Sequence, residues 1–275
     1  MHGCGNDYIY FNCFDQTVPD PESLSIKLSE PHFGIGGDGI ILISPSDKAD
    51  AQMRIFNADG SEGKMCGNGI RCVGKYLYDN GMTDGRTTIT IDTLSGVKTL
   101  ELNVRDGKMQ TARVDMGAAI LEPAKIPVNM AGSSVIDAPL VVDEKVYHVT
   151  CVSMGNPHCV IFFNEDDVDD LDLSRLGPKF EHHPLFPERI NTEFVNVLPD
   201  GSLKMRVWER GSGETWACGT GACATGVAAC LNGFCKPDTD ITVHLRGGDL
   251  TIRYTTETVF MTGAAATVFK GEIEL

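Results

Sequence analysis

The sequence contains one polar stretch twice. The first copy is Arg54–Gly69 (RIFNADGSEGKMCGNG) and the second is Arg206–Gly221 (RVWERGSGETWACGTG). In each copy the cysteine follows the leading arginine by 12 residues (66 − 54 and 218 − 206). A repeat with such a long period indicates a duplicated half-molecule rather than a solenoid. We therefore expect two similar halves that meet face to face, with Cys66 opposite Cys218.

The bulk composition limits the class of protein. A chain of 275 residues can form two domains of about 100–150 residues each. The net charge of −15 argues against a nucleic acid or an anionic membrane as partner, because both need a basic surface. The first residues, MHGCGNDYIYF, lack the pattern of a secretory signal, and no segment has the length of a membrane span. We therefore expect a cytoplasmic protein whose ten cysteines are free thiols.

Apolar patterns place strands and helices on either side of each repeated stretch. Helices are predicted at Pro21–Ser29, Gly67–Asn80 and Gly219–Leu231, each ended by a nearby proline or glycine. Strands are predicted over most of the remaining apolar runs, and 123–139, rich in proline and alanine, is expected to cross between the halves. The GIGGDG run at Gly34–Gly39 is interpreted as a turn, because a dinucleotide site needs its glycines between a strand and a following helix.

Each repeated cysteine stands where a polar loop enters an apolar helix, and Gly-x-Gly follows it. The first N–H groups of a helix and its dipole suit a carboxylate and also stabilise a thiolate. We therefore predict lowered pKa values for Cys66 and Cys218. Two such thiols from facing halves suit inversion at a carbon next to a carboxylate: one removes the α-proton and the other returns a proton from the opposite face.

Other interpretations of these cysteines compete. Buried structural thiols fit one Cys-Gly-x-Gly, but not two in duplicated loops with matched polar flanks. Zinc ligation is disfavoured, because the spacings Cys66–Cys72 and Cys218–Cys223 are not CxxC pairs. A Cys-His acyl-transfer site through His158 stays open, although it leaves the second cysteine unexplained.

The sequence resembles the diaminopimelate epimerase family over essentially its whole length. The motifs that carry the resemblance are GCGNDY at Gly3–Tyr8, FNADGSE at Phe56–Glu62, MCGNG at Met65–Gly69, GNPHC at Gly155–Cys159, ERIN at Glu188–Asn191 and ERGSGETWACGTGAC at Glu209–Cys223. Together they distinguish this family from the related proline racemases and phenazine-biosynthesis isomerases.

The resemblance implies a role for each matching residue. Cys66 and Cys218 would be the two acid/base groups. Backbone amides at Gly67, Asn68, Gly219 and Thr220 would hold the reacting carboxylate, and His158 and Glu209 would adjust the thiol pKa values. The substrate, including the distal end that does not react, would be held by Asn6, Asn57, Asn156, Asn191, Glu209 and Arg210. No metal and no cofactor, pyridoxal phosphate included, is expected.

The fold and function expected from these observations are specific. We predict an α+β protein of two pseudo-symmetric domains, each a curved mixed sheet wrapped around a central helix. The domains are expected at residues 1–117 and 118–263, with the C-terminal strand 264–275 returning to the first. The resemblance implies an isomerase that interconverts LL- and meso-diaminopimelate for lysine and peptidoglycan precursor synthesis. The alternatives are a cofactor-independent racemase of another amino acid and a catalytically silent amino-acid-binding protein.

The chain departs from the family pattern at two positions. Some members have glutamine at the end of the Gly-rich loop, where this chain has Gly39 and offers no side chain. Phe269 stands where members often have a tyrosine at a dimer contact, so the resemblance implies a homodimer as well as a small-molecule substrate.

Overall fold

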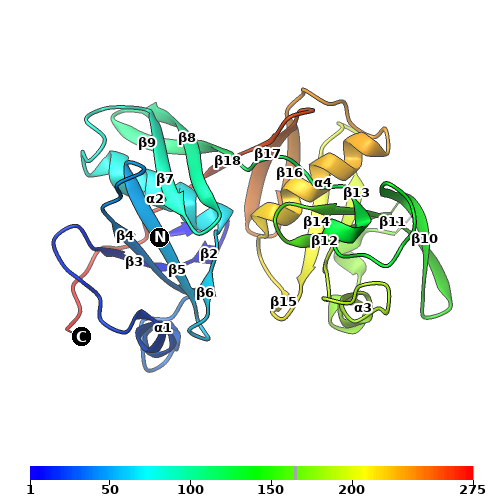
Figure 1. Ribbon diagram of the computed structural model, residues 1–275, viewed down its shortest axis with the longest axis horizontal. Helices are drawn as coiled ribbons and strands as arrows, with labels where there is room; N and C mark the ends of the chain where they lie inside the picture. The colour runs from blue at the N-terminus through cyan, green and yellow to red at the C-terminus, as the bar shows by residue number, and fades with distance from the viewer. Residues whose placement is uncertain (164–165, 275) are drawn as a thin grey trace. The chain divides into compact units, whose positions relative to one another are not determined.

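The computed structural model describes residues 1–163 and 166–274. The chain divides into two compact units (Figure 1). Unit 1 comprises Met1–Asp115 and Thr262–Leu275, and unit 2 comprises Met116–Met261. The strand β18 (Val259–Ala264) contains the second boundary. Within unit 1 the C-terminal segment is tied back to the N-terminus, because His2 and Ala266 exchange two backbone hydrogen bonds of 2.9 Å.

Unit 1 is a mixed sheet with two helices. Its strand order is β3-β4-β5-β7-β8-β9, with β6 paired to β5 and a separate β1-β2 hairpin. β3/β4 and β5/β7 are parallel pairs, and the other pairs are antiparallel. The elements are β1 (His2–Gly3), β2 (Asn6–Asp7), β3 (Ile9–Asn12), α1 (Pro21–Ser29), β4 (Gly39–Ser44), β5 (Ala51–Asn57), β6 (Glu62–Gly63), α2 (Gly67–Asp79), β7 (Thr88–Thr93), β8 (Gly96–Arg105) and β9 (Lys108–Asp115).

Unit 2 is also a mixed sheet with two helices. Its strand order is β10-β11-β12-β13-β14-β16-β17, with β15 paired to β14, and β12/β13 and β14/β16 are its parallel pairs. The elements are η1 (Pro123–Lys125), β10 (Val135–Val142), β11 (Lys145–Ser153), β12 (Pro157–Phe163), η2 (Val168–Asp170), α3 (Leu173–Glu181), β13 (Asn191–Val197), β14 (Leu203–Glu209), β15 (Gly213–Glu214), α4 (Gly219–Leu231), β16 (Ile241–Leu245) and β17 (Gly248–Tyr254).

The two units repeat one topology, as the duplicated stretch predicts. In unit 1 a parallel pair (β3, β4) with α1 between its strands precedes the hairpin β5-β6, helix α2 and the pair β7-β8. In unit 2 the same places are taken by β12, α3, β13, β14-β15, α4 and β16-β17. The register agrees as well, because Arg54 pairs with Leu42 and Arg206 pairs with Phe194. Residues can therefore be matched between the units one by one.

In each unit the helix that follows the repeated cysteine packs against the sheet. The helix α2 contacts β8 and β9, and α4 contacts β11, β12, β13, β16 and β17. Ten of the residues of α4 are buried, which agrees with its sequence of small apolar residues, GTGACATGVAACL. The prediction of an α+β fold built from mixed sheets around a central helix is confirmed. Among the described residues, no helix has both the length and the apolarity that crossing a membrane requires.

Three sequence expectations need correction. Residues 6–14, one of the apolar runs predicted to be a single strand, contain two short strands, β2 and β3, separated at Tyr8. The segment 123–139 does not cross between the halves, because unit 2 already begins at Met116 and β10 begins at Val135. The helix α3 was not predicted, although its counterpart α1 was predicted with the observed bounds. Pro178 and Gly177 in the short α3 conceal its helical pattern.

Candidate active site

In unit 1, Cys66 is the N-cap of α2. Its backbone is extended (φ −130°, ψ 119°), and its sulfur accepts a hydrogen bond from the N–H of Gly69 at 3.3 Å. N-caps are usually Ser, Thr, Asp or Asn, whose oxygen accepts this hydrogen bond. Here a thiol takes that place, so the helix dipole acts directly on a group that can ionise.

The asparagines predicted for unit 1 lie at this cap and at the loop before it. The Cys66 thiol donates to Oδ1 of Asn6 at 3.3 Å, and the Asn6 amide donates to the Asp38 carboxylate at 2.6 Å. Asn57, at the end of β5, accepts a hydrogen bond from the Tyr8 hydroxyl at 3.3 Å. The Gly-rich loop therefore has a local role that its sequence did not reveal: it brings Asp38 to Asn6.

Gly67 and Asn68 form the first turn of α2, and both are buried. Asn68 turns its side chain towards Arg71, whose guanidinium donates to Asn68 Oδ1 at 3.0 Å and to the Gly67 carbonyl at 2.9 Å. Arg71 is completely buried. Sequence analysis missed Arg71, and the only available signal was a charged residue within an otherwise apolar helical run.

In unit 2, Cys218 is the N-cap of α4 in the same manner. Its backbone is extended (φ −111°, ψ 107°), and its sulfur accepts from the N–H of Gly221 at 3.4 Å. Gly219 and Thr220 form the first turn, and the Thr220 hydroxyl lies 3.5 Å from the sulfur. The two cysteines are thus equivalent in position, as the repeat predicts.

The remaining residues predicted for unit 2 line the loop before Cys218 and the adjoining strand ends. Asn191, at the start of β13, accepts from the Arg210 N–H at 3.0 Å, and it donates to the Pro157 carbonyl at 2.8 Å. The Arg210 guanidinium donates to the Glu188 carbonyl at 3.0 Å. The carboxyl of Glu209 accepts from the Thr215 hydroxyl within the same loop. The structure therefore brings Glu209, Arg210 and Asn191 together in unit 2.

Glu181 anchors this loop from α3. Its carboxylate accepts from the Trp208 indole N–H at 2.8 Å and from the Gly211 N–H at 2.9 Å. Arg189 also donates to it at 3.2 Å. Glu181 is a buried residue that sequence analysis missed, because α3 itself was not predicted.

His158 lies on β12 and is fully buried next to Glu193 of β13. Its Nδ1 is 2.7 Å from Glu193 Oε1, and its Nε2 is 3.1 Å from Asn156 Oδ1. The Asn156 amide donates to the Thr220 hydroxyl at 3.2 Å. Glu193 was missed by sequence analysis, although a glutamate inside the apolar run that forms β13 was a visible signal.

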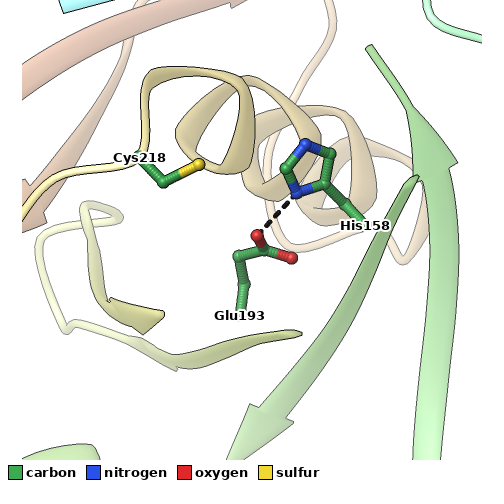
Figure 2. A group of neighbouring side chains, drawn as sticks. All are labelled: His158, Glu193 and Cys218. Carbon is green, nitrogen blue, oxygen red and sulfur yellow. Dashed lines mark hydrogen bonds and ion pairs between the residues drawn. The ribbon is translucent and has the colours of Figure 1, made fainter. Parts of the chain in front are cut away.

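Figure 2 shows His158, Glu193 and Cys218 converging beside the start of α4. Among the described residues, these three form the group whose ligand atoms, all within 4.8 Å of one another, could hold a metal ion. Two ligands of one zinc ion, each bound at about 2.0–2.3 Å, lie roughly 3.3 Å apart in tetrahedral geometry. The 2.7 Å between Nδ1 and Oε1 is a hydrogen-bond distance. We therefore interpret the contact between His158 and Glu193 as a hydrogen bond, in which the two side chains share a proton.

The expected lowering of the Cys218 pKa is wrong. Burial raises the pKa of the Cys218 thiol well above its usual value, and the charges of Glu209 and Glu193 raise it further. Hydrogen bonds from Thr220 and Gly221 favour the thiolate but do not outweigh these effects. The prediction of a lowered pKa was drawn from the helix terminus, whereas burial and the carboxylates of Glu209, just before the cysteine, and Glu193, on β13, act in the opposite direction. Burial and the two carboxylates therefore favour the neutral thiol of Cys218.

Two glutamates of unit 2 should affect stability with opposite dependence on pH. Burial raises the pKa of Glu209, although the Thr215 hydroxyl favours its charged form. Burial also acts on Glu181, but hydrogen bonds from Trp208 and Gly211 hold its pKa below the usual 4.5. The Glu209 contribution to the free energy of unfolding is therefore complete below pH 4.5 and is lost as pH rises through the folded pKa. The Glu181 contribution is present above pH 4.5 and is lost as pH falls through the folded pKa.

Urea unfolding at several pH values checks this pair of signs. Relative to wild type, Glu209→Gln should gain stability as pH rises from 4.5 towards neutrality. Glu181→Gln should lose stability relative to wild type as pH rises from acidic values to 4.5. Parallel curves for both variants would contradict the assignment of the two environments.

The fold is shared with solved structures described as a hydroxyproline epimerase, a probable proline racemase and PhzF-family proteins. A hydroxyproline epimerase from Agrobacterium vitis aligns with a TM-score of 0.69 at 17% identity, covering 96% of this chain and 87% of its own. A PhzF-family protein of Bacillus anthracis aligns with a TM-score of 0.66 at 16% identity, covering 96% and 91%. At such identities the likeness shows the fold.

The chain belongs to the diaminopimelate epimerase family, so it is an isomerase. The model of that family, described as diaminopimelate epimerase, matches residues 1–122 and 150–268. A diaminopimelate epimerase of Agathobacter rectalis is 56% identical over 284 residues, which span 100% of this chain and 98% of the relative. Relatives of the same name from Acetivibrio thermocellus and Methanococcus maripaludis are 55% and 50% identical, again over 100% of this chain and 97% and 98% of their own lengths. The resemblance noted in the sequence is thereby confirmed.

Proposed function

We propose that this protein interconverts LL- and meso-diaminopimelate by a two-thiol mechanism without a cofactor. The observation that carries the proposal is the duplicated N-cap cysteine, Cys66 on α2 and Cys218 on α4, in a chain whose family is named for this reaction. Membership at 50–56% identity over the whole chain supports the substrate.

In the proposed reaction the two thiols act on opposite faces of one α-carbon. The thiolate of one cysteine takes the α-proton, so the C–H electron pair passes to the carbon and into the adjoining carboxylate. The thiol of the other cysteine then donates its proton to the opposite face, and the configuration is inverted. One thiolate and one thiol are present before and after the step, with their roles exchanged. The raised pKa of Cys218 supports its role as the proton donor of the resting protein.

The helix starts supply the electrostatic stabilisation in this proposal. The first turns of α2 (Gly67, Asn68) and α4 (Gly219, Thr220) would place backbone N–H groups and the positive ends of two dipoles at the reacting carboxylate. Negative charge moves onto that carboxylate as the α-proton leaves, so these groups bind the transition state more strongly than the substrate.

The polar residues around the caps are proposed to hold the rest of the substrate. They are Asn6, Asn57, Asn156, Asn191, Glu209 and Arg210. At the distal end of the substrate, Arg210 would pair with a carboxylate group and Glu209 with an amino group. A fixed distal end lets only one centre reach the thiols, which supports a long diamino diacid over a small apolar amino acid.

The cellular setting is part of the proposal. The reaction serves lysine and peptidoglycan precursor synthesis in the cytoplasm, and a homodimer is proposed. Two exposed apolar side chains of the C-terminal segment, Val268 (65% exposed) and Phe269 (62%), support an apolar contact there. A sedimentation mass equal to that of one chain at micromolar concentration would exclude the dimer.

Proton NMR of the reduced protein in D₂O tests the function. With LL-diaminopimelate and no added cofactor, we expect loss of the α-proton signal together with appearance of the meso isomer. Exchange with a different amino acid instead would keep the mechanism and change the substrate. No exchange with any of a panel of amino acids would leave a binding protein.

A further inference from the structure

Glu193 is a buried acid that the proposed reaction does not use. In unit 1 the matching residue is Ile41. Ile41 pairs with Ile55, the residue after Arg54, just as Glu193 pairs with Val207, the residue after Arg206. Both side chains reach the third residue of the neighbouring helix. A Cβ added at Gly69 would lie 2.6 Å from Ile41 Cδ1, and a Cβ added at Gly221 would lie 2.6 Å from Glu193 Oε1. One position thus carries an apolar side chain in unit 1 and a carboxylate in unit 2.

The carboxylate of Glu193 depends on a single neighbour. Its relative exposure is 0%, and its Oε2 has no hydrogen-bond partner among the described residues. Its Oε1 is 2.7 Å from Nδ1 of His158, which is also fully buried (Figure 2). A buried charge is costly unless it is paired. The position of the Glu193 carboxylate therefore depends on its contact with His158.

The hydrogen bonds beyond His158 have a defined direction. The amide oxygen of Asn156 can only accept, so His158 Nε2, at 3.1 Å, donates to it. The Asn156 amide nitrogen donates to Thr220 Oγ1 at 3.2 Å. The Thr220 hydroxyl lies 3.5 Å from Cys218 Sγ and can donate to the sulfur. The chain of bonds runs from the carboxylate to the sulfur and ends with a donor.

We propose that Glu193 is a positioning residue for Cys218: its carboxylate holds the ring of His158, and the chain of hydrogen bonds from His158 through Asn156 to Thr220 presents a hydroxyl donor to the sulfur. Its part in turnover rests on the proposed two-thiol function. The effect is to favour negative charge on Cys218 at the moment when this thiol must give up its proton.

The polar and charged groups that face Cys218 come from four elements. The strand β14 contributes Glu209, β13 contributes Glu193, β12 contributes His158, and α4 contributes the Thr220 hydroxyl and the Gly221 N–H. Glu193 acts on the sulfur in two opposed ways. Its charge alone disfavours the thiolate, whereas the chain that it orients favours the thiolate. The sign of the change on removing its charge therefore separates the two effects.

The experiment is the pH dependence of alkylation by iodoacetamide, measured for each cysteine by peptide mass spectrometry in the unliganded protein. Glu193→Gln keeps the shape of the side chain but removes the charge that strengthens its hydrogen bond to His158, so the chain of hydrogen bonds to Cys218 is weakened. We expect the Cys218 profile to move to higher pH by about 0.4–1 unit, the equivalent of one hydrogen bond. Thr220→Val should move it in the same direction, and Thr220→Ser should restore it.

Cys66 is the internal control, and its profile should not change in any of these variants. A shift of the Cys218 profile to lower pH in Glu193→Gln would overturn the proposal, since the direct charge of Glu193 would then dominate. An unchanged profile in Thr220→Val would overturn it as well, and this variant decides the matter if Glu193→Gln does not fold. Alkylation needs no turnover. A failure of the proposed function would instead appear as absent α-proton exchange in the wild-type protein.

Discussion

Replacement of Cys66 or Cys218 by serine is expected to lower kcat for interconversion of the diaminopimelate isomers by at least about 100-fold. Each sulfur caps a helix at the same place, accepting from Gly69 or Gly221 at 3.3 and 3.4 Å. A serine hydroxyl keeps that hydrogen bond and the packing, but it is far less acidic than a thiol. The variants should therefore fold and still bind substrate, because the positioning groups are unchanged. Initial rates in both directions, with calorimetric binding of the substrate, measure the two effects separately.

Cys235→Ser is the matched control for these variants. Cys235 is a partly buried thiol of unit 2 that contacts the Gly201 carbonyl and lies outside the proposed site. Its replacement should leave kcat within about twofold of wild type, as expected for a substitution outside the site. If Cys66→Ser or Cys218→Ser were as active as Cys235→Ser, the two-thiol mechanism would be wrong.

The internal repeat allowed most of the fold to be predicted from sequence. It located both cysteine caps, and the apolar runs around it gave Pro21–Ser29 and Gly219–Leu231 with the bounds of α1 and α4. These features depend on local signals, namely period, capping and helix-ending residues. The repeat also implied the helix α3, which was not predicted, because α1 stands at the equivalent place in unit 1.

The features that sequence reasoning missed depend on contacts between distant segments. The pKa of Cys218 is set by Glu193 and Glu209 on two different strands and by burial, none of which follows from the residues next to the cysteine. Glu193 and Arg71 were missed for the same reason. A charged residue in an apolar run signals a buried partner, but the identity of that partner, His158 for Glu193 and the Ala264 carbonyl for Arg71, depends on the register of packed elements.

The Gly34–Gly39 loop shows how much a motif leaves open. Its order relative to strand and helix was enough to reject a nucleotide site, and the structure has α1 before it and β4 after it. The pattern did not show that the loop carries Asp38 to Asn6. It also did not show why the last residue of the loop is a glycine.

Gly39→Ala is expected to lower the free energy of unfolding by about 3 kcal/mol or more. Gly39 pairs with Asn57 at the end of β5 and has φ +149°, a conformation that side chains rarely adopt. A Cβ at this position would lie 2.0 Å from the Phe56 carbonyl oxygen and 2.9 Å from Tyr8 Cε1. Backbone cannot move aside as a flexible side chain does, so β4 and β5 would have to separate where Asn57 is held. Urea unfolding measures the loss, and a raised KM in the same variant would report the displacement of Asn57.

Gly132→Ala separates the strain of the backbone from the clash. Gly132 also has a positive φ, +123°, but the nearest atom to an added Cβ is the Ser134 carbonyl oxygen at 3.5 Å, an ordinary contact. This variant should therefore lose only the conformational part, about 1–2 kcal/mol, and keep the wild-type KM. Equal losses in the two variants would mean that the contact with Phe56 is relieved by local movement. In that case a side chain at position 39 is tolerated, and the glutamine that some members of the family carry there could be introduced without separating β4 from β5.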